Sequence, residues 1–334
     1  MILIVFGTRP EWIKIKPVID KIQSVIPFRL LFSGQHLSLI DDSVMNYPVE
    51  SLSIGSGENR LNTIVSSILS HNPTIFKDVT HVMVQGDTTS AFAVALSAFH
   101  HGIKIIHLEA GLRTFDKYNP YPEEFNRCAI TAMSDVHLCP TETSKNNVLA
   151  SNPKDINSIH IVGNTVLDNL LELKPVLEDF IFITMHRREN YATMDRWFYN
   201  INLLAINYPK FKFIFPMHPS PNVQMHKHIL SHVSVTDPMS HEECVDHIRR
   251  CCLIISDSGG IQEEACFLQK KTIVCRQNTE RVEGLNEFSF ICKIPADLDQ
   301  IFVHSMTNVG LVTKPCPYGD GHASERISHI LRHL

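Results

Sequence analysis

Short apolar runs that alternate with helix-compatible stretches constrain the fold of this chain more than any other feature. A first series covers residues 2–6, 28–33, 81–85, 104–108, 136–139 and 159–162. A second series covers residues 180–185, 212–216, 233–236, 253–257 and 272–275. Runs this short and this apolar are typical of parallel strands whose two faces are covered by helices. The alternation therefore predicts an α/β protein with two doubly wound, Rossmann-like domains.

The length of 334 residues also favours two domains, because a single hydrophobic core rarely serves more than roughly 300 residues. Lys174-Pro175, after a helical stretch, marks a plausible linker. We predict an N-terminal domain over residues 1–168, a C-terminal domain over 178–315 and a closing helical segment over 316–334. Domains of this kind bind ligands at the carboxyl ends of their strands.

Composition excludes several classes of partner. The chain has 30 basic and 35 acidic residues and a net charge of −5, which gives no electrostatic case for nucleic acid or an anionic membrane. No apolar stretch approaches the roughly 20 residues of a membrane span. The nine cysteines are scattered without a C-x-x-C pair, which indicates a reducing, cytoplasmic compartment. The 19 histidines include no H-x-x-x-H with a third ligand nearby, so we predict no metal site.

A glycine-rich turn, Ser258-Gly259-Gly260, joins the apolar run ending at Asp257 to a helix-compatible stretch. Unpaired N–H groups at a helix start attract anions, and glycines let a phosphate approach the backbone. We predict that this turn holds a diphosphate and that Glu264 accepts hydrogen bonds from ribose hydroxyls. An ordinary strand–turn–helix is the alternative.

Basic residues follow other predicted strands. Arg9 and Lys14 open the helix after the first strand, where a surface pair is the alternative. Arg276 and Arg281 follow the run over 272–275 and could bind phosphate oxygens in bidentate geometry.

Three carboxylates, Asp87, Glu109 and Glu123, lie at strand ends or in the loops that follow. We expect them to converge above one sheet, where crowding raises carboxylate pKa values and suits acid/base catalysis. Asp87 could instead cap a helix, and Glu123 could form an exposed pair with Arg127.

Two histidines also follow predicted strands. His186 comes after the run over 180–185, and His218 comes after the run over 212–216. A lone histidine at such a place is usually structural, but we expect these two to face the same interdomain cleft.

Together these stretches resemble the non-hydrolysing UDP-N-acetylglucosamine 2-epimerase family. The matching stretches are Gly7–Glu11, Gln85–Thr89, Glu109–Thr114, Pro122–Arg127, Gly163-Asn164-Thr165, His186–Asn190, Asp257–Glu264, Thr279-Glu280-Arg281, Pro317–Gly321 and Arg326-Ile327. Each is a weak signal alone, but the series spans nearly the whole chain in the right order.

The resemblance implies the GT-B type of fold, with the active site in an interdomain cleft, a UDP-binding second domain and a C-terminal helix that crosses back to the first domain. It also implies a homodimer built on the first domain. The implied reaction is reversible inversion at C2 of UDP-GlcNAc to UDP-ManNAc through a glycal, without a redox or metal cofactor.

The resemblance also implies roles for individual residues. Asp87, Glu109 and Glu123 would form the acid/base set, with His186 beside the diphosphate. UDP and the sugar would be held by Arg9, Lys14, Arg113, Arg127, His218, Met239, Ser258, Gly259, Gly260, Glu264, Arg276 and Arg281. A second, activating substrate molecule would be held by Gln35, His36, Arg60, Glu124 and Arg187.

The chain departs from the family pattern at several positions. Ser38 replaces a glutamine of the activating site, and Cys244 stands where an aromatic usually lies against the uracil. A hydrolysing epimerase, a glycosyltransferase and a UDP-sugar-binding module without turnover stay as alternatives. Diacetamido and uronate UDP-sugars stay as alternative substrates.

Overall fold

The chain divides into two compact units in a computed structural model that describes residues 1–35, 42–71, 73–151, 155–307 and 310–334. Unit 1 comprises Met1–Asn169 with Gly321–Leu334, and unit 2 comprises Leu170–Asp320. The chain therefore passes between the units twice, after Asn169 and after Asp320.

Unit 1 contains a parallel sheet in the order β3-β2-β1-β4-β5-β6-β7. Its strands are β1 (Ile2–Phe6), β2 (Phe28–Phe32), β3 (Val49–Ser51), β4 (His81–Gln85), β5 (Lys104–Leu108), β6 (Val136–Cys139) and β7 (Ile159–Ile161). Its helices are α1 (Arg9–Ile22), α2 (Arg60–Leu69), α3 (Thr89–His100), α4 (Glu123–Met133), α5 (Glu142–Ala150) and α11 (Ala323–Leu331).

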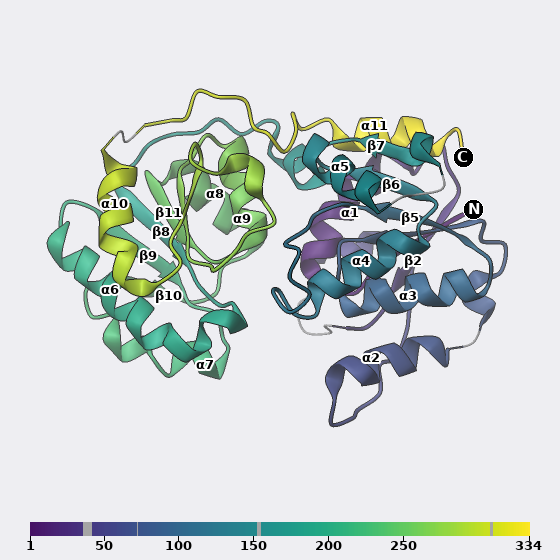
Figure 1. The fold of residues 1–334 in the computed structure, drawn as a ribbon, viewed down its shortest axis with the longest axis horizontal. Helices are drawn as coiled ribbons and strands as arrows, with labels where there is room; N and C mark the ends of the chain where they lie inside the picture. Colours follow the sequence, from purple (N-terminus) through teal and green to yellow (C-terminus); the bar gives the residue numbers. More distant parts are fainter. Residues whose placement is uncertain (36–41, 72, 152–154, 308–309) are drawn as a thin grey trace. The chain divides into compact units, whose positions relative to one another are not determined.

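Helices cover both faces of this sheet (Figure 1). On one face, α1 contributes Trp12 and Ile15, and α11 contributes Ile327 and Leu331 to the same core. On the other face, buried side chains of α2 and α3 pack against the sheet, together with Ile130 of α4. All residues of β1 and β4 are buried, as expected for central strands covered on two sides.

Unit 2 repeats this plan with a parallel sheet in the order β10-β9-β8-β11-β12-β13. Its strands are β8 (Phe180–Thr184), β9 (Lys212–Pro216), β10 (Ser234–Thr236), β11 (Leu253–Ser256), β12 (Thr272–Val274) and β13 (Ser289–Ile291). Its helices are α6 (Met194–Asn207), α7 (Pro221–Gln224), α8 (His241–Arg250), α9 (Gly259–Phe267) and α10 (Leu298–Met306).

The main core of unit 2 lies between its sheet and α6 with α10. Trp197 and Phe198 of α6 and Phe302 of α10 are buried there. On the opposite face, His247 of α8 stacks on Phe182 of β8.

The predicted fold class of two doubly wound Rossmann-like domains is confirmed by these two strand orders. The prediction missed two strands, β3 and β13, each at the edge of its sheet and only three residues long. Shortness and edge position alone do not explain this, because β7 and β10 are also three-residue edge strands and both coincide with predicted runs. Over the described residues, no helix combines the length and apolar character that crossing a bilayer requires.

Candidate active site

The strand order reverses beside β1 in unit 1, and several predicted site residues follow β1 and its neighbour β4. Loops at such a switch point diverge and leave room for a ligand. Arg9, the first residue of α1, is half-buried, and its Nε has no hydrogen-bond partner among the described residues. Asp87 follows β4 in the neighbouring loop.

Glu109 is bound from three directions. Its Oε1 lies 2.5 Å from Nζ of Lys14 and accepts a hydrogen bond of 3.3 Å from Nδ2 of Asn164, while Gln85 donates to Oε2. Lys14 is only 9% exposed, so it is not the surface cation that a lone residue at a helix start suggests. Glu109 also has a φ of 67°, a left-handed conformation that non-glycine residues seldom adopt outside functional sites.

Asp87 is held by α4. Its Oδ2 accepts a 3.0 Å hydrogen bond from Nε of Arg127 and a second one from Nη2. Nδ2 of Asn126 donates to the backbone oxygen of Asp87 at 2.9 Å. The cap of α3 is Thr88, whose hydroxyl accepts from the N–H of Ala91, so Asp87 does not cap that helix. Asp87 and Glu109 therefore each face a cation of their own.

Glu124, predicted to bind an activating substrate, is buried and committed to protein groups. Its carboxylate accepts from the backbone N–H groups of Thr114 and Phe115 at 3.1 and 3.0 Å. It also accepts from Nη1 of Arg127 at 3.1 Å. Glu123, the predicted acid/base residue, precedes Glu124 and is the first residue of α4. Glu124 thus orients the arginine that holds Asp87.

Arg113 was predicted to bind the ligand, but it is buried and donates to Thr131 Oγ1 and to the backbone oxygen of Leu112, both at 2.8 Å. Burial lowers the pKa of its guanidinium. These contacts fix the loop after β5 to α4.

Glu11 is a residue of this region that was not predicted as functional. It is 2% exposed, and its carboxyl accepts from the N–H of Gly7 at 2.9 Å and from the hydroxyl of Thr88 at 2.8 Å. Burial raises its pKa to about 7, and the hydrogen bond from Thr88 partly offsets this. Glu11 therefore ties the turn after β1 to the turn after β4.

We expect Glu11→Gln to remove a pH dependence of stability. Because the folded-state pKa lies above the ordinary value of 4.5, the folded chain binds the extra proton and loses stability as pH rises from about 4.5 to about 7. The variant cannot ionise, so its free energy of unfolding should rise relative to the parent by on the order of 2–3 kcal/mol between pH 5 and pH 8. Urea unfolding monitored by Trp12 fluorescence in a Trp197→Phe background reports on unit 1. An equal difference at both pH values would contradict this expectation.

At the corresponding switch point of unit 2, Asp257 orients the loop after β8. Asp257 is completely buried, and its carboxylate accepts from the N–H groups of His186 and Arg187 at 3.0 and 2.8 Å. It also accepts from Nδ2 of Asn190 at 3.0 Å. The ring of His186 stacks on that of His218 with centroids 5.2 Å apart. Burial and the neighbouring imidazole of His186 lower the pKa of His218.

The predicted anion-binding turn is formed by Ser258, Gly259 and Gly260, and Ser258 is the N-cap residue of α9. Its side chain makes no capping hydrogen bond. A Cβ on Gly259 would lie 2.7 Å from Nη1 of Arg281, whereas a Cβ on Gly260 would meet no described residue outside its own helix turn within 4 Å. Packing of the protein therefore accounts for the glycine at 259 but not for the one at 260.

Arg276 and Arg281 are both buried and paired with carboxylates. Glu280 accepts from Nη1 of Arg276 at 3.1 Å and from Nη1 of Arg281. Arg281 also donates through Nε to Glu263 at 2.9 Å, and Arg276 donates to Glu189 at 3.0 Å. The bidentate phosphate contacts expected of these arginines stay a prediction.

Other residues predicted around the nucleotide lie in α8, α9 and the loop before α8. The carboxylate of Glu264 is hydrogen-bonded at 2.6 Å to Nε2 of His241, the first residue of α8. Met239 and Cys244 are half-buried.

Residues predicted to bind an activating substrate belong to both units. In unit 1, Gln35 accepts from the N–H of Ser90 at 2.9 Å, and Arg60 donates to the backbone oxygen of Gln35 at 3.0 Å. His36 and Ser38 lie outside the described residues. Arg187 belongs to unit 2 and is half-buried.

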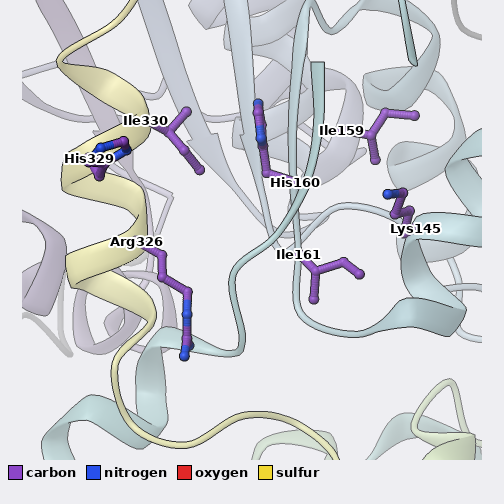
Figure 2. Close-up of a pocket in the computed structure, with 7 residues that line it drawn as sticks. All are labelled: Lys145, Ile159, His160, Ile161, Arg326, His329 and Ile330. Carbon is purple, nitrogen blue, oxygen red and sulfur yellow. The ribbon is translucent and has the colours of Figure 1, made fainter. Parts of the chain in front are cut away.

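A surface pocket of about 450 Å³ in unit 1 contains none of the predicted residues (Figure 2). Arg326 of α11 and Lys145 of α5 lie on opposite sides of β7 in this view. The lining is Lys145, Ile159, His160, Ile161, Arg326, His329 and Ile330. Its lining has no carboxylate, so this pocket is not the site expected to hold Asp87, Glu109 and Glu123.

Comparison with known proteins gives one consistent result. A family model described as UDP-N-acetylglucosamine 2-epimerase matches residues 21–332. The UDP-N-acetylglucosamine 2-epimerase of Campylobacter jejuni is 34% identical, with 99% of this chain and 97% of that protein covered. The enzyme of Bacillus subtilis is 35% identical, with 98% and 93% covered. The crystal structure of the Neisseria meningitidis enzyme bound to UDP-GlcNAc superimposes with a TM-score of 0.89 at 32% identity, over 100% of both chains.

Proposed function

We propose that this chain, which belongs to the UDP-N-acetylglucosamine 2-epimerase family, interconverts UDP-GlcNAc and UDP-ManNAc without releasing free sugar. In this reaction the C1–O bond breaks, UDP leaves with the bonding electrons, and a base removes the C2 proton to give a glycal. UDP then adds back at C1 as a proton returns to the opposite face of C2. The route moves a proton and no hydride, so it needs no nicotinamide.

The acid/base set of unit 1 would serve both faces of the sugar. Asp87, Glu109 and Glu123 are the proposed groups, since a base or acid is needed on each face. The observation that supports this best is the pairing of Glu109 with Lys14 and of Asp87 with Arg127, which gives each of two carboxylates in the loops after β5 and β4 a cation beside it. Carboxylates near C1 would also stabilise the positive charge that develops as UDP leaves.

Unit 2 would bind UDP. The N–H groups that open α9 suit a diphosphate, and a Cβ on Gly260 would have no described neighbour outside its own helix turn within 4 Å. His186 would lie beside the diphosphate, on the loop that Asp257 orients. Glu264 would accept from the ribose hydroxyls.

Deuterium incorporation at C2 tests the reaction. The protein is incubated in D₂O with UDP-GlcNAc and, separately, with diacetamido and uronate UDP-sugars, and the products are followed by NMR. We expect UDP-ManNAc and UDP-GlcNAc deuterated at C2 with UDP-GlcNAc as substrate. Accumulation of free UDP with free sugar would instead indicate a hydrolysing epimerase. Tight binding without exchange would indicate a binding module.

Gly260→Ala is expected to weaken UDP binding without loss of stability. Outside its own helix turn, a methyl group there meets no atom of the described residues within 4 Å, and alanine favours a helix over glycine by up to about 1 kcal/mol. The methyl would instead stand between the helix N-terminus and a phosphate, so we expect Kd for UDP to rise about tenfold or more. Calorimetry with UDP and thermal unfolding of the same samples measure the two effects. An unchanged Kd would argue against a phosphate at this turn.

A homodimer built on unit 1 in the cytoplasm completes the proposal. Phe99 of α3 and Phe125 of α4 are each more than half exposed, and a partner subunit that packs on these two helices would cover both. The nine thiols are free, as a reducing compartment requires. Sedimentation of the parent and of a Phe99→Asp variant tests the dimer.

A further inference from the structure

Tyr318 connects two parts of unit 2 that are far apart in sequence. It lies two residues before the point where the chain leaves unit 2, and it is only 1% exposed. Its hydroxyl accepts a hydrogen bond from the N–H of Gly284 and donates one to the backbone oxygen of Arg281, both at 3.0 Å. The hydroxyl therefore closes both ends of the short turn from Arg281 to Gly284.

The hydroxyl of Tyr318 lies close to Gly284, where a side chain would not fit. A Cβ on Gly284 would lie 2.9 Å from Oη of Tyr318 and 3.1 Å from Sγ of Cys266. Glycine at 284 is thus a condition for the tyrosine to reach the turn. Because Cys266 belongs to α9, the tyrosine is packed between the turn and that helix.

The side chain of Arg281 links the turn that Tyr318 holds to the first turn of α9. Its Nη1 lies 2.7 Å from where a Cβ of Gly259 would stand, and its Nε donates to Glu263 of α9 at 2.9 Å. A shift of the backbone at 281 would therefore move the guanidinium across the helix start. That start carries the turn assigned above to the diphosphate.

We propose that Tyr318 is a positioning residue for nucleotide binding, which sets the backbone of Arg281 and so fixes the guanidinium beside the glycine turn. The inference rests on the proposed function in so far as the ligand is UDP. Tyr318 itself would not touch the nucleotide; it would act through Arg281.

Tyr318→Phe tests this, because it removes the hydroxyl and keeps the ring. Two polar groups of the turn then lose their partner, so we expect Kd for UDP to rise about tenfold. The KM for UDP-GlcNAc should rise by a similar factor while kcat changes less than about threefold, since the reacting groups are untouched. Tyr47→Phe is the matched control, because it removes a hydroxyl that donates to Asp20 at 2.5 Å in unit 1. Its Kd for UDP should equal that of the parent.

A double-mutant cycle separates positioning from a general loss of stability. Gly284→Ala should also weaken UDP binding, because the new Cβ displaces the tyrosine hydroxyl. If both changes act on the same contact, the double variant should have a Kd for UDP no higher than that of the single variant with the higher Kd. Fully additive losses, or a Tyr318→Phe variant that binds UDP as the parent does, would overturn the proposal.

The proposed function can fail separately. A parent protein that binds UDP but shows no deuterium exchange at C2 would refute the epimerase and still allow the Tyr318 comparison. A parent protein that does not bind UDP at all would overturn both.

Discussion

Glu109→Gln is expected to lower kcat for epimerisation about 1,000-fold, within the range typical of a lost general acid or base. The amide cannot accept a proton from C2 or return one. It also faces donors: Lys14, Gln85 and Asn164 all point N–H groups at the two oxygens, and an amide can satisfy only one side. Deuterium incorporation at C2 should fall in parallel with turnover, whereas Kd for UDP should change little.

Two controls separate chemistry from folding in this variant. Glu50→Gln neutralises a carboxylate that pairs with Arg29 at the exposed edge of the sheet, and it should leave kcat unchanged. Unfolding monitored by Trp12 in a Trp197→Phe background shows whether unit 1 of the Glu109 variant is intact. A folded variant that turns over at more than about a tenth of the parent rate would remove Glu109 from the acid/base set.

The fold was accessible from sequence because burial on two faces makes each central strand a continuous apolar run. β1, β4, β8 and β11 all coincide with predicted runs. β3 lacks this signal because the Val49–Ser51 strand is largely exposed. The predicted site residues followed from the same logic, since loops after parallel strands gather at one edge of a sheet.

The partners of those residues were not accessible from sequence. Lys14 and Glu109 are 95 positions apart, and no periodicity or spacing links them. Arg127 was read as the neighbour of Glu123 on α4, whereas the structure also pairs it with Asp87 and Glu124. Glu11 appeared only as the last letter of a motif, because its raised pKa depends on burial that only the fold creates. Sequence therefore located the strand ends, and the structure supplied the charge balance there.

Asp257→Asn is expected to cost unit 2 about 3 kcal/mol of stability and to lower activity at least about 100-fold. The buried carboxylate accepts from His186 N, Arg187 N and Asn190 Nδ2, so the amide of asparagine would set an N–H group against another donor. The loop that carries His186 should then move away from the start of α9. Urea unfolding followed by Trp197 in a Trp12→Phe background measures the loss, and turnover is assayed under conditions where the variant is folded.

Asp246→Asn is the matched control, because that acid pairs with Arg249 and Arg250 at the surface and its substitution should cost less than about 1 kcal/mol. Equal losses in the two variants would mean that Asp257 does not organise this loop.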